Sequence, residues 1–405
     1  MPNEQAHNPD QKLPLQEAGG LLSGQSPATN QKLPLQGAGG LRIIISGGGT
    51  GGHIFPAVAI ANALKKLDPA TEILFVGANG RMEMDKVPAA GYKIIGLDIQ
   101  GIQRKAIWKN ILFPIKLIAS VSKAVGIINS FKPDAAVGVG GYASGPLLYA
   151  ASMKGIPTLI QEQNSYAGIT NKWLSKKAEK ICVAFDGMDK FFPADKIVKT
   201  GNPVRRQSVD TTGKKEEALK EFNLLPNKKT ILVTGGSLGA RTLNHSLLAD
   251  LDKLIAVDVQ LIWQTGKVYY KGIMEKLGDN YHPNIRILEF LNRMDLAYAA
   301  ADMIISRAGA GTIAELCIIG KPVILVPSPN VAEDHQTKNA LALVQTNAAV
   351  FVTDKDAETT LIPKALELLK DKDQQETLSA NISKLALPSA DEVIAQHVID
   401  MINNR

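Results

Sequence analysis

The feature that most constrains the fold is a strand, glycine loop and helix pattern that occurs twice, once in each half of the chain. The first copy is LRIIISGGGTGGHIFP from Leu41, and the second is KKTILVTGGSLGAR from Lys228. A short continuous apolar run is typical of a strand buried in a parallel sheet, and the glycines allow a sharp turn into the helix. Two such modules predict two Rossmann-like α/β domains, each with a doubly wound parallel sheet.

The length of 405 residues also favours two domains, because single hydrophobic cores rarely grow beyond about 300 residues. The break at Gly201-Asn202-Pro203 predicts a first domain over 41–202 and a second over 203–386. Residues 1–40, in which QKLPLQ occurs twice, are expected to be a disordered leader without a role in the chemistry. Residues 387–405 are expected to form a helix that packs back on the first domain.

Further apolar runs predict the other buried strands, and they are TEILFVG, DAAVGVGG, IPTLIQE, KICVAF, DVQLIWQTG, IRILEF, ADMIIS and PVILVP. Helices are predicted between them. One covers 56–67, where Pro56 suits the first helical turn, and a charged surface helix covers 213–222. This alternation of strands and helices is typical of parallel doubly wound sheets.

The composition argues against several classes of function. Cys182 and Cys317 are the two cysteines, and neither lies in a CxxC motif or a Cys/His cluster, so neither a disulfide framework nor a zinc site is expected. The chain has no run of eighteen apolar residues, and its polar N-terminus does not resemble a secretory signal. Aromatic residues make up 5% of the chain, so a stacking surface for nucleic acid is not expected.

The positive charge is concentrated in one stretch. Between Asp98 and Asp134 the sequence has no acidic residue and six basic ones, which equals the net charge of +6. Within this stretch, residues 107–118 (IWKNILFPIKLI) combine apolar side chains with lysines, a composition suited to docking on an anionic membrane surface. The alternative is a core helix whose lysines extend to solvent. A local patch of this kind does not indicate a nucleic-acid partner.

The glycine loops are candidate phosphate sites, because glycines let backbone N–H groups approach an anion at a helix N-terminus. Gly47, Gly49 and Gly52 satisfy GxGxxG, but Val76-Gly77-Ala78-Asn79 offers no acid where a dinucleotide site needs one. A phosphate-bearing ligand other than NAD therefore fits better. A third segment, Gly138–Pro146, follows another predicted strand, at the edge where parallel sheets bind ligands. Each loop taken singly could also be a tight turn only.

Seven segments together resemble one known family, and they are GGGTGGHIFPAVAIA, GVGGYASGP, QEQN, TGNPVR, VTGGSLGAR, SRAGAGTIAEL and DHQTKNA. They occur in the order and approximate spacing of the MurG family, GT-B enzymes of glycosyltransferase family 28, and the resemblance covers about residues 41–403. It implies two Rossmann-like domains facing a cleft. It also implies inverting transfer of N-acetylglucosamine from UDP-GlcNAc to the undecaprenyl-linked muramyl-pentapeptide of peptidoglycan synthesis. The expected location is peripheral, at the cytoplasmic face of the plasma membrane, with other cell-wall synthesis proteins as partners and a role in cell shape and division.

The resemblance further implies which residues contact each substrate. In UDP-GlcNAc, the backbone of Leu291 would contact the uracil, Glu315 the ribose and Gln336 the sugar hydroxyls. The other residues implied for the UDP-GlcNAc site are Thr50, Gly51, Gly52, Asn164, Arg205, Ser237, Ala310, Gly311 and Thr312. The loop at Thr50 would also hold the pyrophosphate of the acceptor, together with Gly141, Tyr142 and Ser144.

The acceptor hydroxyl needs a general base, for which His53 is the leading candidate and Glu162 the second. The alternative for His53 is a histidine that starts a helix and bonds only to backbone. The family motif HEQN is QEQN here, and because Gln161 cannot titrate, an acid–base role at that position is in doubt. We expect no metal and no cofactor, because no DxD-type pair lies near the donor motifs and helix N-termini with an arginine can stabilise the leaving diphosphate.

Several alternative functions remain open at this stage. A different GT-B enzyme, such as a diacylglycerol glycosyltransferase or a UDP-GlcNAc 2-epimerase, would share the fold, and an epimerase would need neither a lipid acceptor nor a membrane patch. An NAD-binding oxidoreductase rests on GxGxxG alone. A non-catalytic nucleotide-binding scaffold would leave the acceptor motifs without a use.

Overall fold

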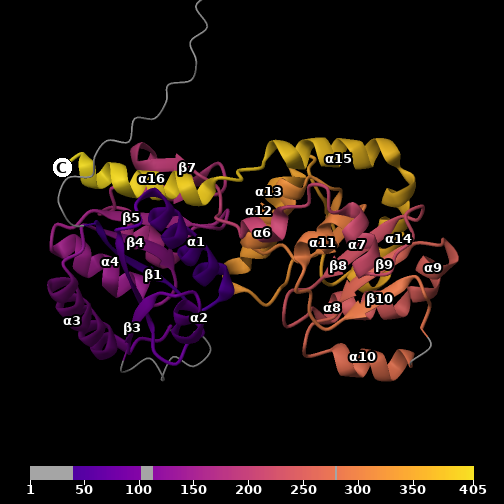
Figure 1. Cartoon of the computed structure of the whole chain (residues 1–405), viewed down its shortest axis with the longest axis horizontal. Helices are drawn as coiled ribbons and strands as arrows, with labels where there is room; N and C mark the ends of the chain where they lie inside the picture. The colour runs from indigo at the N-terminus through magenta and orange to yellow at the C-terminus, as the bar shows by residue number, and fades with distance from the viewer. Residues whose placement is uncertain (1–39, 102–112, 279–280) are drawn as a thin grey trace, which may run out of the picture. The chain divides into compact units, whose positions relative to one another are not determined.

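The computed structural model describes residues 40–101, 113–278 and 281–405 (Figure 1). Apart from Gly40, the expected leader lies outside the described residues. Two β-sheets organise the described chain, one in each half.

The first sheet has seven strands in the order β3-β2-β1-β4-β5-β6-β7, and neighbouring strands run parallel. They are β1 (Arg42–Gly47), β2 (Glu72–Ala78), β3 (Lys93–Leu97), β4 (Ala135–Gly140), β5 (Thr158–Glu162), β6 (Lys180–Val183) and β7 (Ile197–Lys199). Ile43, Ile44 and Ile45 of β1 are completely buried, as expected for a central strand covered on both faces. The chain runs outward from β1 to β3 and returns to β4 beside β1, so the loops after β1 and β4 flank the switch point where such sheets bind ligands.

The helices associated with this sheet are α1 (Gly51–Leu67), α2 (Glu83–Ala89), α3 (Phe113–Phe131), α4 (Ser144–Met153), α5 (Ile169–Leu174) and α16 (Ala390–Asn403). α1 begins at Gly51, before its predicted start, so Gly51, Gly52 and His53 form its first turn and Pro56 lies inside it. The final helix α16 packs against α1 and also contacts β4 (Figure 1).

The second sheet has six strands in the order β10-β9-β8-β11-β12-β13, again with parallel neighbours. They are β8 (Thr230–Thr234), β9 (Gln260–Gln264), β10 (Ile285–Leu288), β11 (Met303–Ser306), β12 (Val323–Leu325) and β13 (Val350–Phe351). Its helices are α6 (Arg206–Val209), α7 (Lys215–Glu221), α8 (Arg241–Ala249), α9 (Leu251–Ala256), α10 (Tyr270–Leu277), α11 (Met294–Ala300), α12 (Ala310–Ile319), α13 (His335–Val344), α14 (Ala357–Lys370) and α15 (Lys372–Lys384). The switch point of this sheet lies between the loops after β8 and β11.

The two parallel, doubly wound sheets confirm the predicted fold class. Every strand that the apolar runs predicted is present. The strands β3, β7 and β13 were not predicted, and each of them forms an edge of its sheet. Edge strands are partly exposed and therefore need no continuous apolar run, which is the signal that the central strands provide.

Candidate functional site

His53 lies at the switch point of the first sheet, in the first turn of α1. Its Nδ1 atom is 3.0 Å from the carbonyl oxygen of Gly48 and 3.4 Å from Oγ of Thr50. Because a carbonyl only accepts, Nδ1 carries the proton and Nε2 is left as a proton acceptor. Desolvation lowers the pKa of His53, although the Gly48 carbonyl and the charge of Glu162 act in the raising direction. At neutral pH the imidazole is therefore uncharged and can act as a base.

Two N–H groups of the first glycine loop are already bonded within the protein. The Gly48 N–H donates to the Gly140 carbonyl at 3.2 Å, and the Gly49 N–H donates to Oε2 of Glu83 at 2.8 Å. The first N–H groups of a helix lack acceptors within it, which leaves those of Gly51 and Gly52 available to an anion. Within the first glycine loop, the N–H groups that remain for a phosphate are therefore those at the start of α1.

The third glycine segment packs against this loop. Gly140 and Gly141 have φ angles of 102° and 96°, in the region that favours glycine. A Cβ on Gly140 would lie 2.8 Å from Nε2 of His53, and a Cβ on Gly141 would lie 2.6 Å from the Gly48 carbonyl oxygen. Both positions therefore depend on glycine, and the segment that was predicted to bind the acceptor lies beside Nε2 of His53.

The other predicted acceptor residues differ in accessibility. Tyr142 is exposed, and the Arg81 guanidinium lies 5.7 Å from the centroid of its ring. Ser144 is completely buried at the start of α4. A contact between Ser144 and an acceptor would therefore have to use its backbone N–H, at the helix N-terminus.

Glu162, at the end of β5, is a fully hydrogen-bonded carboxylate. Its Oε1 accepts from the backbone N–H of Asn164 at 3.1 Å and from the Asn164 side chain at 3.3 Å. Its Oε2 accepts from the Gly168 N–H at 3.0 Å and from Nδ2 of Asn171 at 2.8 Å. Four donors match the roughly four lone-pair sites that a carboxylate offers, and the residue is only 2% exposed. A substrate hydroxyl would find no free oxygen here.

Gln161 belongs to a buried amide network. Its Nε2 donates to Oδ1 of Asn202 at 2.9 Å, and its Oε1 accepts from Nε2 of Gln163. Asn202 in turn donates to the carbonyls of Gln163 and Ala310, at 2.9 and 3.3 Å. These bonds connect β5 to the first residue of α12 through groups that do not titrate.

Asn339 of α13 makes a second connection between the two halves. It is buried, its Oδ1 accepts from the Ser165 N–H at 2.9 Å, and its Nδ2 donates to Oδ1 of Asn164 at 3.1 Å. Both ends of the Asn164 amide are therefore bonded: its oxygen accepts from Asn339, and its nitrogen donates to Glu162. Sequence reasoning did not single out Asn339, although it lies in the DHQTKNA segment.

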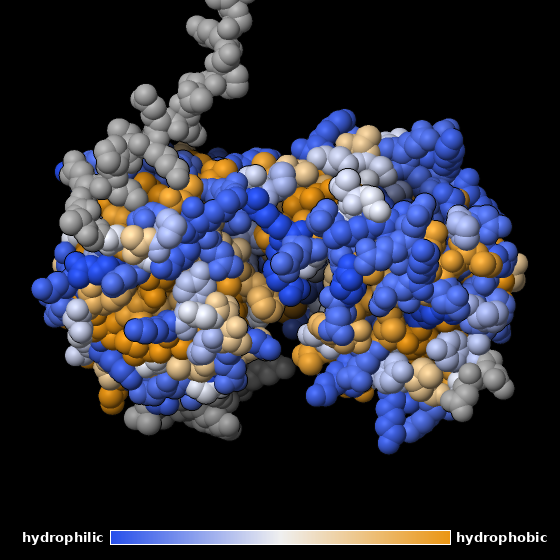
Figure 2. Space-filling model, in the orientation of Figure 1, coloured by the Kyte–Doolittle hydropathy of each residue, from blue (hydrophilic) through white to orange (hydrophobic). Residues whose placement is uncertain are grey.

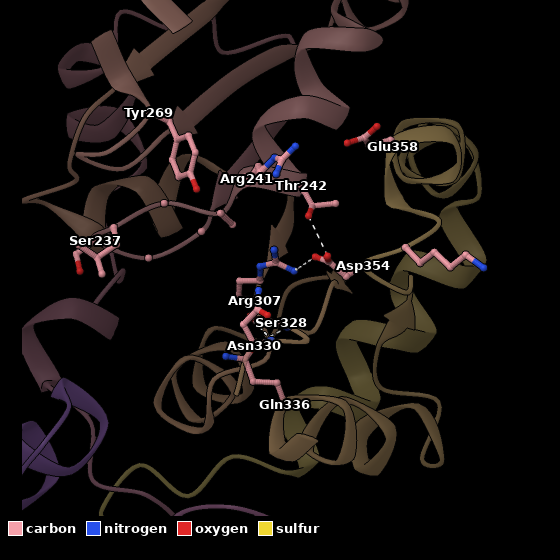
Figure 3. A pocket seen from close by; sticks show the side chains of 16 residues that line it. Ser237, Arg241, Thr242, Tyr269, Arg307, Ser328, Asn330, Gln336, Asp354 and Glu358 are labelled. Carbon is pink, nitrogen blue, oxygen red and sulfur yellow. Dashed lines mark hydrogen bonds and ion pairs between the residues drawn. The ribbon is translucent and has the colours of Figure 1, made fainter. Parts of the chain in front are cut away.

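A cavity of about 670 Å³ lies beside the second glycine loop (Figure 3). This volume is within the range of small-molecule sites, roughly 300–1,000 Å³. Two predicted residues line it from different elements, Ser237 from the loop and Gln336 from α13, and Oε1 of Gln336 accepts from the Ser328 N–H at 2.9 Å. The other lining residues are Gly235, Gly236, Leu238, Gly239, Ala240, Arg241, Thr242, Tyr269, Arg307, Ser328, Asn330, Asp354, Lys355 and Glu358.

Arg307, which follows β11, is held in the wall of this cavity. Its guanidinium pairs with Asp354 and donates to two backbone carbonyls after β12, at 3.0 and 3.1 Å. Asp354 also accepts from Oγ of Thr242 at 3.0 Å (Figure 3). Arg241, at the start of α8, adds a second guanidinium to the wall. Such groups suit a phosphorylated ligand, since arginine binds phosphate through charge-assisted hydrogen bonds.

Glu315, inside α12, forms a pair with the buried Tyr298, whose hydroxyl donates to Oε2 of Glu315 at 2.9 Å. Burial raises the pKa of Glu315, while the Tyr298 bond and the charge of Arg205 act in the lowering direction. Arg205 itself lies with its Cζ 4.9 Å from the centroid of the Phe55 ring on α1. Arg205 thus contacts a side chain of α1 and acts electrostatically on the Glu315 carboxylate. Tyr298 is a further residue that the sequence did not single out.

The remaining predicted donor residues lie at loop ends of the second sheet. Ala310, Gly311 and Thr312 form the first turn of α12, where N–H groups lack acceptors within the helix. Leu291 is buried, so a ligand could meet its backbone but not its side chain. The cavity lining includes neither α12 nor Leu291, so the structure joins Ser237 and Gln336 in one cavity, and the other predicted donor residues are not part of its lining.

Both halves of the chain match one family. Residues 43–183 match the glycosyltransferase family 28 N-terminal domain, and residues 230–394 match the C-terminal domain. A relative from Parabacteroides distasonis, a UDP-N-acetylglucosamine–N-acetylmuramyl-(pentapeptide) pyrophosphoryl-undecaprenol N-acetylglucosamine transferase, is 59% identical over 90% of this chain and 99% of its own. The relative of the same name from Bacteroides thetaiotaomicron is 60% identical over 89% of this chain and 98% of its own.

Solved structures that resemble this chain include a member of the same family and enzymes that share only its fold. The crystal structure of Acinetobacter baumannii MurG aligns with a TM-score of 0.73 and 31% identity, over 90% of this chain and all of that one. The UDP-GlcNAc 2-epimerase from Neisseria meningitidis aligns with a TM-score of 0.61 and 16% identity, over 89% of this chain and 99% of its own. At this identity the epimerase shows a shared fold alone.

Proposed function

The chain belongs to glycosyltransferase family 28, and from this we propose that it transfers N-acetylglucosamine from UDP-GlcNAc to undecaprenyl-diphospho-muramoyl-pentapeptide. The transfer forms a β-1,4 linkage and converts lipid I to lipid II in peptidoglycan synthesis. The observation that carries the proposal is the 59% identity to a named transferase over 90% of this chain and 99% of that relative. Identity across both halves supports the same donor and the same acceptor.

The donor would bind to the second half of the chain. The first-turn N–H groups of α12 and the guanidinium of Arg205 would face the diphosphate, where helix N-termini and cations stabilise negative charge. Glu315 would accept hydrogen bonds from the ribose hydroxyls, and the backbone of Leu291 would contact the uracil. Gln336, in the cavity wall, would contact the sugar hydroxyls.

In the proposed reaction, the acceptor hydroxyl attacks the anomeric carbon of the donor from the face opposite UDP, so the configuration inverts. Nε2 of His53 takes the hydroxyl proton, and the electron pair of the broken C–O bond leaves with UDP. The lowered pKa of His53 supports this role, because an uncharged imidazole is the form that accepts a proton. The first-turn N–H groups of Gly51 and Gly52 would bind the acceptor's pyrophosphate near this base.

Glu162 fits a different role from that of the base. Its four hydrogen bonds order the segment from Asn164 to Asn171, and one of them fixes the Asn164 amide that would contact the sugar nucleotide. We therefore assign Glu162 to positioning and His53 to proton transfer.

The transfer is tested by measuring UDP release from UDP-GlcNAc with and without the lipid-linked muramyl-pentapeptide. We expect release that depends on the lipid acceptor. Release without any acceptor would indicate a hydrolase or an epimerase, and no release with UDP-GlcNAc would refute the donor assignment. A His53→Ala variant should lose turnover far more than donor affinity, and near-normal turnover would refute the assignment of the base.

The lipid acceptor requires contact with a membrane, and we propose that the start of α3 provides it. Residues 107–112 of the predicted segment lie outside the described residues, and its remainder begins α3. Ile115 and Ile118 are 64% and 70% exposed, and Lys116 between them is also exposed. Exposed isoleucines next to a lysine favour interfacial docking over a core helix.

The neighbouring helices also carry exposed apolar side chains. α3 packs against α4, and α4 packs against α5. Met153 at the end of α4 and Trp173 on α5 are each 58% exposed, and the Trp173 ring lies 5.1 Å from that of Tyr149. In Figure 2, hydrophobic residues are interspersed with hydrophilic ones over the half of the molecule in which Figure 1 labels α3 and α4. Within the residues that the structure describes, no helix is long and apolar enough to cross a bilayer.

The membrane proposal places the protein peripherally at the cytoplasmic face of the plasma membrane. Replacing Lys105, Lys109 and Lys116 by glutamine should weaken binding to anionic vesicles, since each lysine near such a surface contributes about 1 kcal/mol. Turnover with a short-chain, water-soluble acceptor should stay unchanged. Unaltered vesicle binding would refute the proposal.

A further inference from the structure

Glu83 is a buried carboxylate that the proposed reaction does not use. It is the first residue of α2 and is 1% exposed. Its Oε1 accepts from the Ala78 N–H at 3.0 Å, and its Oε2 accepts from the Gly49 N–H at 2.8 Å. A carboxyl group whose two oxygens both accept hydrogen bonds from backbone N–H groups is in its ionised form, because an ionised carboxylate only accepts. The structure therefore holds a negative charge directly behind the first glycine loop.

Two glycines make the room for this side chain. A Cβ on Gly48 would lie 2.2 Å from Oε1 of Glu83, and a Cβ on Gly77 would lie 2.6 Å from its Cγ. Both positions exclude any other residue unless the carboxylate moves. The glycines at 48 and 77 thus serve a protein side chain as well as any substrate.

The peptide unit between Gly48 and Gly49 connects Glu83 to His53. Its N–H donates to Glu83, and its carbonyl is 3.0 Å from Nδ1 of His53. The bond is trans, as are all peptide bonds of the described residues, so the N–H and the C=O point in opposite directions. Carboxylate, peptide and imidazole therefore form one chain of hydrogen bonds, in which each bond polarises the next.

We infer that Glu83 is a positioning residue for His53 and acts through the Gly48–Gly49 peptide. This inference rests on the proposed role of His53 as the base. By accepting the Gly49 N–H, Glu83 turns the Gly48 carbonyl toward Nδ1, which keeps the proton on Nδ1 and the lone pair on Nε2. The negative charge also stabilises the imidazolium that forms when Nε2 takes the acceptor's proton. The same charge acts on the resting enzyme, where desolvation and the charge of His335 on α13 lower the pKa of His53, and Glu83 raises it after the larger effects of the Gly48 carbonyl and Glu162.

The decisive variant is Glu83→Gln, which keeps the shape of the side chain, removes its charge and turns an NH₂ group toward one of the two N–H donors. Asp85→Asn is the matched control, because it removes an exposed carboxylate from the same helix. Two quantities are measured: the pKa of His53 by NMR titration, assigned by the signal lost in His53→Gln, and the pH profile of kcat and of KM for UDP-GlcNAc.

We expect Glu83→Gln to lower the pKa of His53 and to move the acidic limb of kcat to lower pH. The plateau of kcat should fall by about tenfold, less than the roughly 10²- to 10⁴-fold that the general base itself contributes, because Glu83 acts only through His53. KM for UDP-GlcNAc should change less than about twofold, because Glu83 does not contribute to binding the donor in the ground state. Asp85→Asn should match the wild type in every measurement.

An unchanged His53 pKa in a folded Glu83→Gln protein would overturn the inference, whatever happens to kcat. A fall in kcat with the same pKa would show that Glu83 only builds the loop. If Glu83→Gln does not fold, Glu83→Asp is measured instead, because its shorter side chain moves the carboxylate away from the Gly49 N–H by one methylene. The pKa of His53 should again fall, and an unchanged pKa would again overturn the inference. The NMR titration needs no turnover, so a wild type without transferase activity would refute the proposed function and leave this test intact.

Discussion

The two candidate bases can be separated by one pair of glutamine substitutions, Glu162→Gln and His53→Gln. A glutamine at 162 offers one acceptor oxygen in place of two, so its NH₂ group must face two of the four N–H donors. The bonds to Asn164, at 3.1 and 3.3 Å, are longer than those to Gly168 and Asn171, at 3.0 and 2.8 Å. The amide should therefore turn its NH₂ group toward Asn164.

The size of the effect follows from this geometry. A hydrogen bond to a charged group contributes about 1.5–3 kcal/mol, so losing two gives about 3–6 kcal/mol. Asn164 is only half-buried and water can reach its freed groups, which places the expected loss of unfolding free energy near the lower bound, about 3 kcal/mol. His53 is only half-buried and glutamine still carries an NH₂ donor, so the free energy of unfolding of His53→Gln should change by no more than about 1 kcal/mol.

Turnover should respond in the opposite order. His53→Gln should reduce kcat by roughly 10²- to 10⁴-fold without a comparable loss of stability. Glu162→Gln should lose stability and raise KM for UDP-GlcNAc, while the surviving kcat keeps its acidic limb. Urea unfolding and UDP release across pH measure both quantities, with Glu72→Gln as the exposed control for the same chemical change. A Glu162→Gln protein of normal stability that lacks turnover and the acidic limb would refute this reasoning and make Glu162 the base.

Three further outcomes follow from the site. Asn339→Ala removes two hydrogen bonds to the 164–165 segment, so the free energy of unfolding should fall by about 2 kcal/mol and KM for UDP-GlcNAc should rise; unchanged values in urea unfolding and kinetics would contradict the connection. Tyr298→Phe removes a hydrogen bond that lowers the pKa of Glu315, so this carboxylate should become protonated at a higher pH than in the wild type. When the pH is lowered, KM for UDP-GlcNAc should therefore start to increase earlier in the variant. A KM profile like that of the wild type would be evidence against this pairing. In the wild type, the lowered pKa of His53 should place the acidic limb of kcat/KM below the ordinary histidine range, which a pH–rate profile checks; a limb above that range would contradict the assignment.

The sequence determined the architecture through local patterns. Central strands of a parallel sheet are buried on both faces, so runs such as IIIS and ILVT identified them without any knowledge of the fold. The glycine loops predicted a ligand-binding edge for each sheet, and His53 was singled out because it adjoins the first loop; its role as the base stays a prediction. The edge strands β3, β7 and β13 were not predicted, because strands that are partly exposed lack the continuous apolar run.

Tertiary structure alone decided which groups of the site are free to act. The Gly49 N–H is occupied by Glu83, which is 34 residues away, and Asn164 is held by Asn339, which is 175 residues away. Glu162, a plausible base from its motif, is saturated by donors from the following loop and helix. Residues so distant meet only because the crossovers return the chain to the switch point of each sheet, and no periodicity of the sequence records which side chains face each other there.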